Sequence, residues 1–438
     1  MDFLAASEKF NLENPAKSVQ VSSLRQAARE FLAEKGLPSR KIENWKYTSL
    51  KPLTENNFFT VKSPQSISAE LAQLIQKNIT SEFSNVVILN GEYRPELSDK
   101  LESGIVVSVS PVDSIKSVPN FSEMQGDSYL HALSGLFASS EIKVQVKDKV
   151  QLKKPVRLLF FYHSSGGPSL MTYPRTRIEI GNESQVTFLE SHVGLENFRY
   201  FVNSLSEINC GKNSHVEYVF QQNQSDTAIQ TAQSIFNLQS AVKLKTLSFQ
   251  LGTALMRHNM DVNLNDTGSA VDLFGLSILA RKQHCDNKTQ INHLVGYCET
   301  KQLYKSILSG ESRYIFSGKI KITHNAQKAS SQQLNKNLLL SKTAEVDSEP
   351  QLEVEADDVK ATHGSTVGQL NDEEIFYFKS RGISEEKALN LLSRGFAFDI
   401  LYQFENQSLK KLLDIDLENA FVKLSEGLGR QAKNLETT

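Results

Sequence analysis

Apolar and polar residues alternate with a period of two along most of the chain between residues 141 and 370. Short stretches such as "EIKVQVKDKV", "RTRIEIGNES" and "KIKITH" are rich in β-branched or aromatic residues, and Asn, Gly, Asp and Ser separate them. A period of two is the pattern of β-strands with one buried face. Amphipathic helical segments are nearly absent from this region, so we predict a mainly β core.

Similar stretches recur within this β region. Gly-Asn-Glu-Ser-Gln-Val at 181–186 and Gly-Lys-Asn-Ser-His-Val at 211–216 lie 30 residues apart. Asn-Gly pairs of the kind that close two-residue hairpins do not recur between the strands. A loose repeat of this length is typical of coils stacked into a β-helix. The pattern alone leaves a β-helix and a large β-sandwich as equal alternatives.

The N-terminal part has helical periodicity instead. "SLRQAAREFLAEKG" places Leu24, Ala28 and Leu32 on one apolar stripe, and Gly36 ends the predicted helix. The only tryptophan, Trp45, follows in "RKIENWKYTSL". It serves either as an anchor for a partner or as local packing of the helical start.

The C-terminal part is helical again from residue 371 onward. "DEEIFYFKSRG" predicts a helix that ends at Gly382. "EEKALNLLSRG" predicts the next helix, and helical sequence continues through "FAFDILYQF" and "SLKKLLDIDLENAFVKLSEGL". We therefore predict an N-terminal helical or mixed domain at 1–140, a β core at 141–370 and a C-terminal helical domain at 371–438.

Charge and cysteine content narrow the class of protein. Lys plus Arg is 48 and Asp plus Glu is 50, so the net charge of -2 gives no general attraction to nucleic acid or to an anionic membrane. The N-terminus has no secretory signal pattern, and no stretch approaches the roughly 20 apolar residues of a membrane-spanning helix. Three cysteines do not make a disulfide framework, which indicates a reducing, cytoplasmic compartment.

Common catalytic and nucleotide-binding motifs are missing from the sequence. It contains no phosphate-binding loop, no dinucleotide fingerprint, no H-E-x-x-H and no C-x-x-C. His284, Cys285, His293 and Cys298 have side chains that bind zinc, but their spacing matches no common zinc site. In strand-like sequence, alternation would put them on different faces, so we interpret them as structural residues.

His363 is the strongest candidate for a functional residue. It lies in "ATHGSTVGQL", residues 361–370, where the last strand-like stretch meets the helical part. Imidazole binds iron or zinc and titrates near neutral pH, and Gly364 leaves room for a ligand or a partner backbone. A polar residue in a turn is the alternative interpretation.

The segment that begins at His363 resembles the signature of the SufB/SufD family of iron–sulfur cluster assembly proteins. "HGSTVGQLNDEEIFYFKSRG" is similar to the family pattern of His, small residues, GQL, two acidic residues, FY and RG. "RKIENWKYTSL" resembles the N-terminal family motif, and "VVILNGEYRPELS", "LKKPVRLLFFY" and "YPRTRIEIGNESQVTFLES" follow in family order. The resemblance covers nearly the whole chain, with specific motifs at both ends and a weaker match between them.

Two positions are similar to the SufD branch rather than the SufB branch. SufB-like chains carry a cysteine shortly before the final strands, where this chain has Asn335, and a Glu after the junction His, where it has Gly364. Some SufD-like chains have a Cys two residues before the His, and this chain departs from that pattern with Ala361. His363 remains the candidate ligand on this side.

The resemblance implies a right-handed parallel β-helix core, flanked by N-terminal and C-terminal helical domains. It implies a non-catalytic scaffold subunit of the SufB–SufC–SufD complex, which pairs with SufB through its late coils while the ATPase SufC hydrolyses ATP. A nascent iron–sulfur cluster, shared transiently with SufB and not bound tightly by this chain alone, would form where a SufB cysteine faces His363. The resemblance decides neither whether His363 is a ligand or a proton acceptor nor whether a flavin binds. The residues implied for SufC docking on the C-terminal helices are Phe376, Arg381, Arg394, Gly395 and Phe396.

Two other functions stay open on the sequence alone. The chain could be a homodimeric adaptor that holds SufC and has no direct cluster role. It could also be a β-helix enzyme that processes polysaccharides, which would need paired carboxylates on neighbouring coils. The sequence offers Asp261, Asp266 and Asp272 for such a group.

Overall fold

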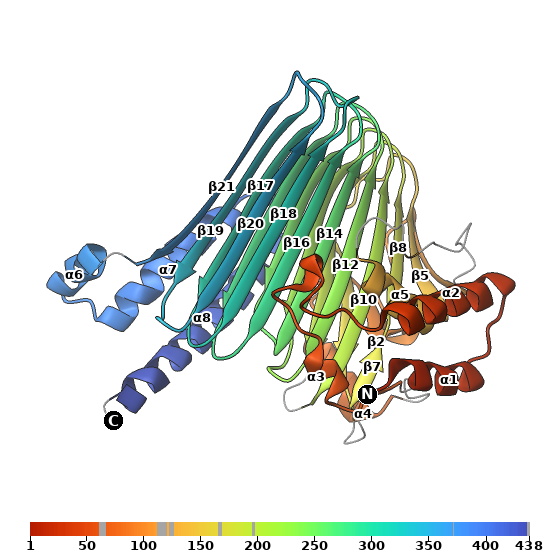
Figure 1. Cartoon of the computed structure of the whole chain (residues 1–438), viewed down its shortest axis with the longest axis horizontal. Helices are drawn as coiled ribbons and strands as arrows, with labels where there is room; N and C mark the ends of the chain where they lie inside the picture. The colour runs from red at the N-terminus through yellow and green to blue at the C-terminus, as the bar shows by residue number, and fades with distance from the viewer. Residues whose placement is uncertain are drawn as a thin grey trace.

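Two sheets of long strands face each other across a narrow core and form a parallel β-helix (Figure 1). The computed structural model describes residues 1–60, 67–111, 121, 127–164, 169–194, 198–370 and 372–435. Successive coils place one strand in each sheet, so strands two apart in the sequence are hydrogen-bonded neighbours. The predicted β-helix with flanking helices is confirmed, and the β-sandwich alternative is wrong.

Sheet A has the spatial order β20 (Glu345–Val354), β18 (Arg313–Ile322), β16 (His284–His293), β14 (Leu255–Leu264), β12 (Ile229–Leu238), β10 (Tyr200–Cys210), β8 (Arg175–Ile180), β5 (Ser140–Val146) and β4 (Ile105–Pro111), with β7 (Leu170–Thr172) beside β10 and β1 (Phe59–Thr60) beside β7. Sheet B has the order β21 (Lys360–Gln369), β19 (Ser330–Leu339), β17 (Glu299–Leu308), β15 (Ala270–Leu279), β13 (Lys243–Gln250), β11 (His215–Asn223), β9 (Gln185–Gly194), β6 (Val156–Tyr162), β2 (Ser84–Leu89) and β3 (Glu92–Tyr93). Strands β2 and β4, which precede residue 141, already belong to the two sheets.

The recurring Gly-x-x-Ser stretches are stacked corners of the coils. Glu183 and Asn213 both have φ 56°, the left-handed conformation that turns the chain between strands. A Cβ on Gly211 would lie 2.7 Å from the carbonyl oxygen of Ile180, so the close stacking of corners requires glycine there. Paired residues are 30 apart between Phe188 and Tyr218 but 27 apart between Thr246 and Leu273, which makes the repeat loose.

The N-terminal helices cover the outer face of sheet A. Helices α1 (Phe3–Glu13), α2 (Val19–Lys35) and α5 (Ser128–Leu136) share an apolar cluster with Phe201 and Ile229 of the sheet. The predicted end of α2 is confirmed, because Gly36 follows it with φ 68°. The short elements of this part are η1 (Glu43–Trp45), α3 (Lys51–Thr54), α4 (Ala69–Gln76) and η2 (Pro95–Leu97).

The C-terminal helices α6 (Asp372–Ser380), α7 (Glu385–Leu401) and α8 (Gln407–Leu435) follow β21, and α7 and α8 pack on the outer face of sheet B. Leu409, Leu413 and Leu417 repeat every four residues on α8 and are buried against the sheet. Helix α7 continues through Gly395, where a Cβ would meet no atom within 4 Å. Among the described residues, no helix is long and apolar enough to cross a membrane.

Candidate functional site

The two strands at the late end of the β-helix, β20 and β21, have no strand partner on their outer edges among the described residues. Figure 1 shows β21 as the outermost strand, directly before α6. Strand β20 contains Pro350 and several acidic residues, which are features that discourage pairing at an edge. Strand β21, "KATHGSTVGQ", has only Lys360 as a charged residue. The β21 edge is therefore free to pair with another chain.

His363 lies on β21 at the open mouth of the solenoid. It pairs in register with Gln333, which in turn pairs with Gln302, and both glutamines are buried inside the coils. The side chain of His363 therefore belongs to an inward-facing row and is exposed only because no further coil covers it. Within the described part of the chain, His363 makes no hydrogen bond or ion pair. The ring is available to a group that approaches from the end of the β-helix.

Gly364 and Asn335, two positions that distinguish the branches of the family, lie close to His363. A Cβ on Gly364 would be 3.4 Å from Leu334 Cδ1, an ordinary contact, so the backbone alone does not require glycine there. Asn335 is fully buried beside Ser365 in register, and its Nδ2 donates to the Tyr304 carbonyl oxygen at 3.1 Å. Its Oδ1 accepts from Asn337 and from Ser348, so this side chain is fully engaged inside the coil.

The five residues implied for partner docking have two kinds of surroundings. Phe376 is 72 % exposed on α6, and Arg381 stacks over the Tyr377 ring at 5.1 Å, also in an exposed position. On α7, Gly395 is exposed, whereas Arg394 is hydrogen-bonded to Glu418 of α8. Phe396 is half-buried, with Lys305 of β17 over its ring at 4.6 Å. Phe376, Arg381 and Gly395 are thus the members of the set that can meet a partner without rearrangement.

The residues considered for zinc do not form a cluster. His284 faces the N-terminal segment, where its Nε2 lies 2.9 Å from Thr48 Oγ1, whereas Cys285 points into the core and donates to Gln250 Oε1 at 3.3 Å. Burial raises the pKa of the Cys298 thiol above its usual value. No group of three His, Cys, Asp or Glu residues that could hold a metal ion exists in the described ranges.

The three aspartates considered for polysaccharide chemistry are not brought together. Asp261 is on β14 of sheet A, Asp272 is on β15 of the opposite sheet, and Asp266 is in the corner between them. The paired carboxylates that this alternative requires are therefore absent from the described surface at these positions.

A buried arginine fastens the segment around Trp45 to sheet A, a feature that the sequence did not reveal. Trp45 is 1 % exposed, and the guanidinium of Arg257 on β14 lies 3.8 Å from the centre of its ring. Arg257 also donates to Asp286 at 2.6 Å, to Asp127 at 3.2 Å and to the Asn44 carbonyl oxygen at 2.9 Å. Of the two interpretations of Trp45, the structure supports local packing.

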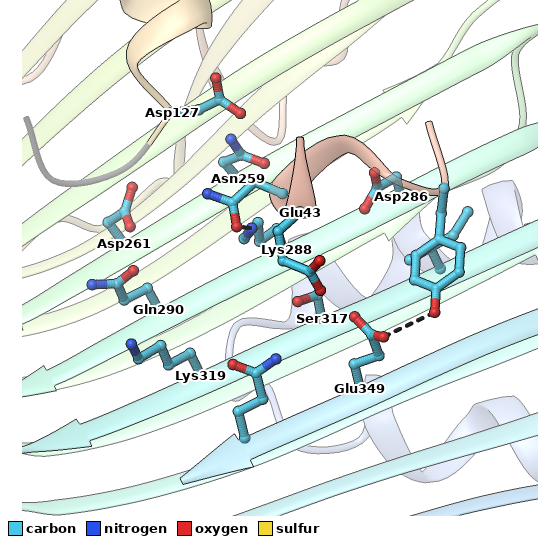
Figure 2. Close-up of a pocket in the computed structure, with 14 residues that line it drawn as sticks. Glu43, Asp127, Asn259, Asp261, Asp286, Lys288, Gln290, Ser317, Lys319 and Glu349 are labelled. Atoms are coloured by element: carbon cyan, nitrogen blue, oxygen red, sulfur yellow. Dashed lines mark hydrogen bonds between the residues drawn. The ribbon is translucent and has the colours of Figure 1, made fainter. Parts of the chain in front are cut away.

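Beside this arginine, a cavity of about 220 Å³ separates η1 from the outer face of sheet A (Figure 2). Its lining residues come from η1 and the residues after it, from the N-cap of α5 and from strands β14, β16, β18 and β20. Burial raises the pKa of Asp261 in this cavity to about 6, and the nearby Asp127 acts in the same direction. A hydrogen bond from Gln233 and the charge of Lys288 oppose this rise.

The raised pKa of Asp261 predicts a pH-dependent loss of stability. Because the folded state holds this proton more tightly than the unfolded state, stability falls as the pH rises from about 4 to about 6. The change in pKa corresponds to about 3 kcal/mol. We expect Asp261→Asn to raise the free energy of unfolding by an amount of this order above the folded pKa and to change it little below the unfolded pKa. Urea denaturation of the variant and of the unaltered chain, below about pH 4 and above about pH 6, checks this. A variant that is less stable than the unaltered chain by the same amount at both pH values would contradict it.

Comparison with known proteins agrees with the motifs at both ends of the chain. The family model for the SufBD core domain of SUF system FeS cluster assembly matches residues 161–396, and the model for the SufBD protein N-terminal region matches residues 6–158. Iron-sulfur cluster assembly protein SufD of Escherichia coli (strain K12) is 33 % identical over 90 % of this chain and 92 % of its own length. A SufBD family protein of Synechocystis is 28 % identical, covering 93 % and 92 %. SufD of Bacillus subtilis (strain 168) is 25 % identical, covering 93 % and 94 %.

Proposed function

Because the chain belongs to the SufBD family of iron–sulfur cluster assembly proteins, we propose that it acts as a SufD-type scaffold subunit that pairs with SufB and docks the ATPase SufC. The free edge of β21 carries this proposal, since an unpaired strand of ten residues with a single charged side chain offers its backbone N–H and C=O groups to another chain. A strand of SufB added along β21 would continue sheet B across the two subunits.

His363 gives this interface its chemistry. Its imidazole is exposed at the mouth of the coils and is free of partners among the described residues, so it can face a group of the second subunit. We propose that a neutral His363 either ligates an iron of the nascent cluster or accepts a proton from a SufB thiol. In this proposal the cluster is a product that is passed on and not a resident cofactor, and SufB supplies its cysteine ligands. ATP hydrolysis is assigned to SufC, because this chain has no phosphate-binding loop.

The homodimeric adaptor is the competing proposal, because two copies of β21 could also cover each other. Mixing the purified chain with SufB and SufC and measuring the molar mass by light scattering distinguishes the two. The SufB–SufD proposal expects a complex that contains one copy of this chain and one of SufB. A complex of two copies of this chain with SufC, without SufB, would favour the adaptor.

Docking of SufC is proposed for the exposed face of α6. Phe376 and Tyr377 are both exposed there, and large exposed aromatic residues often anchor interfaces. Helix α6 begins three residues after β21, so a SufC movement on α6 could be passed to the strand that holds His363.

Phe376→Ala is expected to weaken SufC binding without affecting folding. Loss of an aromatic anchor costs on the order of 2 kcal/mol of binding free energy, which corresponds to about thirtyfold in the dissociation constant. Calorimetric titration of SufC into the variant measures this. Tyr402→Ala is the matched control, because Tyr402 is a similarly exposed aromatic residue at the end of α7. Unchanged affinity for the Phe376 variant would exclude this part of α6 from the docking surface.

A further inference from the structure

The cavity under η1 presents two in-register rows of polar side chains from four successive strands of sheet A (Figure 2). The first row is Asn259, Lys288, Ser317 and Glu349, and the second is Asp261, Gln290, Lys319 and Gln351. The residues around η1 close the cavity from above, and Tyr47 donates a hydrogen bond to Glu349 at 2.8 Å.

Most charged groups around the cavity already have a partner of opposite charge. The ion pairs are Lys46 with Glu43 and Glu349, Arg257 with Asp127 and Asp286, and Lys319 with Glu353. The ammonium of Lys288 donates to Asn44 Oδ1 instead of to a carboxylate. Asp261 has no ion-pair partner among the described residues.

At the base of the cavity, one buried amide oxygen has no hydrogen-bond donor, and a buried aspartate beside it accepts one side-chain hydrogen bond and has no ion-pair partner among the described residues. Asn259 is 4 % exposed, and its Oδ1 has no hydrogen-bond partner in the described part of the chain. Asp261 is 8 % exposed, and one of its oxygens accepts from Gln233 Nε2 at 2.9 Å. The two residues are two apart on β14 and therefore lie on the same face of the strand. An unpaired buried acceptor and an unpaired buried carboxylate are both costly, and a ligand that donates hydrogen bonds would relieve both costs.

The chemistry of these two groups selects the ligand. An anionic ligand is disfavoured because it would be repelled by the carboxylates of the cavity, where Lys288 is the one lining cation among the described residues without an ion-pair partner. A neutral alcohol is disfavoured because it would leave the negative charge of Asp261 uncompensated. A directly bound metal ion does not fit, because the described residues offer no group of three metal-binding side chains. We propose that this cavity binds a small molecule through a primary ammonium group, which donates hydrogen bonds to Asn259 Oδ1 and to the carboxylate of Asp261. This site is separate from the β21 edge and does not depend on the proposed scaffold function.

Calorimetric titration of the purified full-length chain with putrescine tests the proposal, with the corresponding butanediol as the uncharged counterpart. The titration is made above pH 6, so that Asp261 is ionised while the amine stays protonated. We expect saturable binding of one putrescine per chain and no saturable heat with butanediol. Equal binding of both compounds, or no saturable heat with putrescine at millimolar concentrations, would overturn the proposal.

Two variants with opposite expected effects separate ligand contact from a structural role. Asp261→Asn removes the charge that attracts the ammonium group and is expected to weaken binding by about tenfold or more. Lys288→Gln removes a competing positive charge from the same cavity and is expected to tighten binding. Asp272→Asn makes the same chemical change on the opposite sheet and is expected to leave the affinity unchanged. Binding that is insensitive to Asp261→Asn, or that weakens equally in all three variants, would show that the ammonium does not bind here.

Discussion

Replacement of His363 by alanine is expected to abolish cluster formation in the proposed complex with SufB and SufC, while the complex still assembles. The ring is exposed at the mouth of the coils, and no described residue of its own chain depends on it, so its loss removes chemistry without removing packing. Strand β21 would keep its backbone pairing with β19. Absorption and Mössbauer spectroscopy of the anaerobically purified complex measure the cluster, and light scattering measures the assembly.

His324→Ala is the matched control for this experiment. His324 is also exposed and follows β18, but it lies in the turn after the strand rather than on the open edge. The control should form clusters at the level of the unaltered chain. Normal cluster formation by the His363 variant would refute the role assigned to this residue. Failure of the variant to assemble with SufB and SufC would show instead that His363 is needed for the structure of the complex.

Replacement of Arg257 by methionine is expected to cause the largest loss of stability, on the order of 3–5 kcal/mol. The variant keeps much of the apolar stem but leaves Asp127 and Asp286 as buried carboxylates without their cation. It also removes the cation from the face of Trp45. Because Trp45 is the only tryptophan in the chain, its fluorescence reports on this segment directly. The urea midpoint of the fluorescence change should therefore fall markedly in the variant.

Arg281→Met serves as the control for the loss of an arginine ion pair. Arg281 pairs with Asp226 at the surface, where both side chains are about half exposed. An exposed pair contributes about 1 kcal/mol or less, so the midpoint should hardly move. Similar midpoints for the two variants would mean that Arg257 does not hold the Trp45 segment to sheet A.

The pattern of apolar and polar residues was sufficient to predict strands and flanking helices, but only the family resemblance favoured a β-helix over a sandwich. Alternation from residue 141 onward reflects one inward and one outward face in every strand. The number of residues per coil varies: the paired residues Thr246 and Leu273 are 27 apart in the sequence, whereas Gln302 and Gln333 are 31 apart. A sequence repeat of fixed length is therefore absent. Helix α7 continues through Gly395, where packing on sheet B outweighs the low helix propensity of one glycine.

The sequence pointed to one residue of the candidate site, but not to its surroundings. His363 was chosen as the candidate because it lies at the junction of two periodicities, within a family motif. That it faces inward, at the end of a row of buried glutamines, depends on the strand register, which a single sequence does not give. The cavity under η1 was missed because Asp261, Lys288, Lys319 and Glu349 come from four different coils and have no common spacing.

Hydrogen exchange of the β21 backbone measures most directly whether the open end of the β-helix is the interface with SufB. The backbone N–H groups of residues 360–369 that point away from β19 have no strand partner among the described residues. They should therefore exchange quickly in the isolated chain. We predict that SufB slows exchange in this strand, whereas exchange in β13, which is paired on both edges, stays unchanged. Unchanged exchange of β21 in a fully formed complex with SufB would contradict the account.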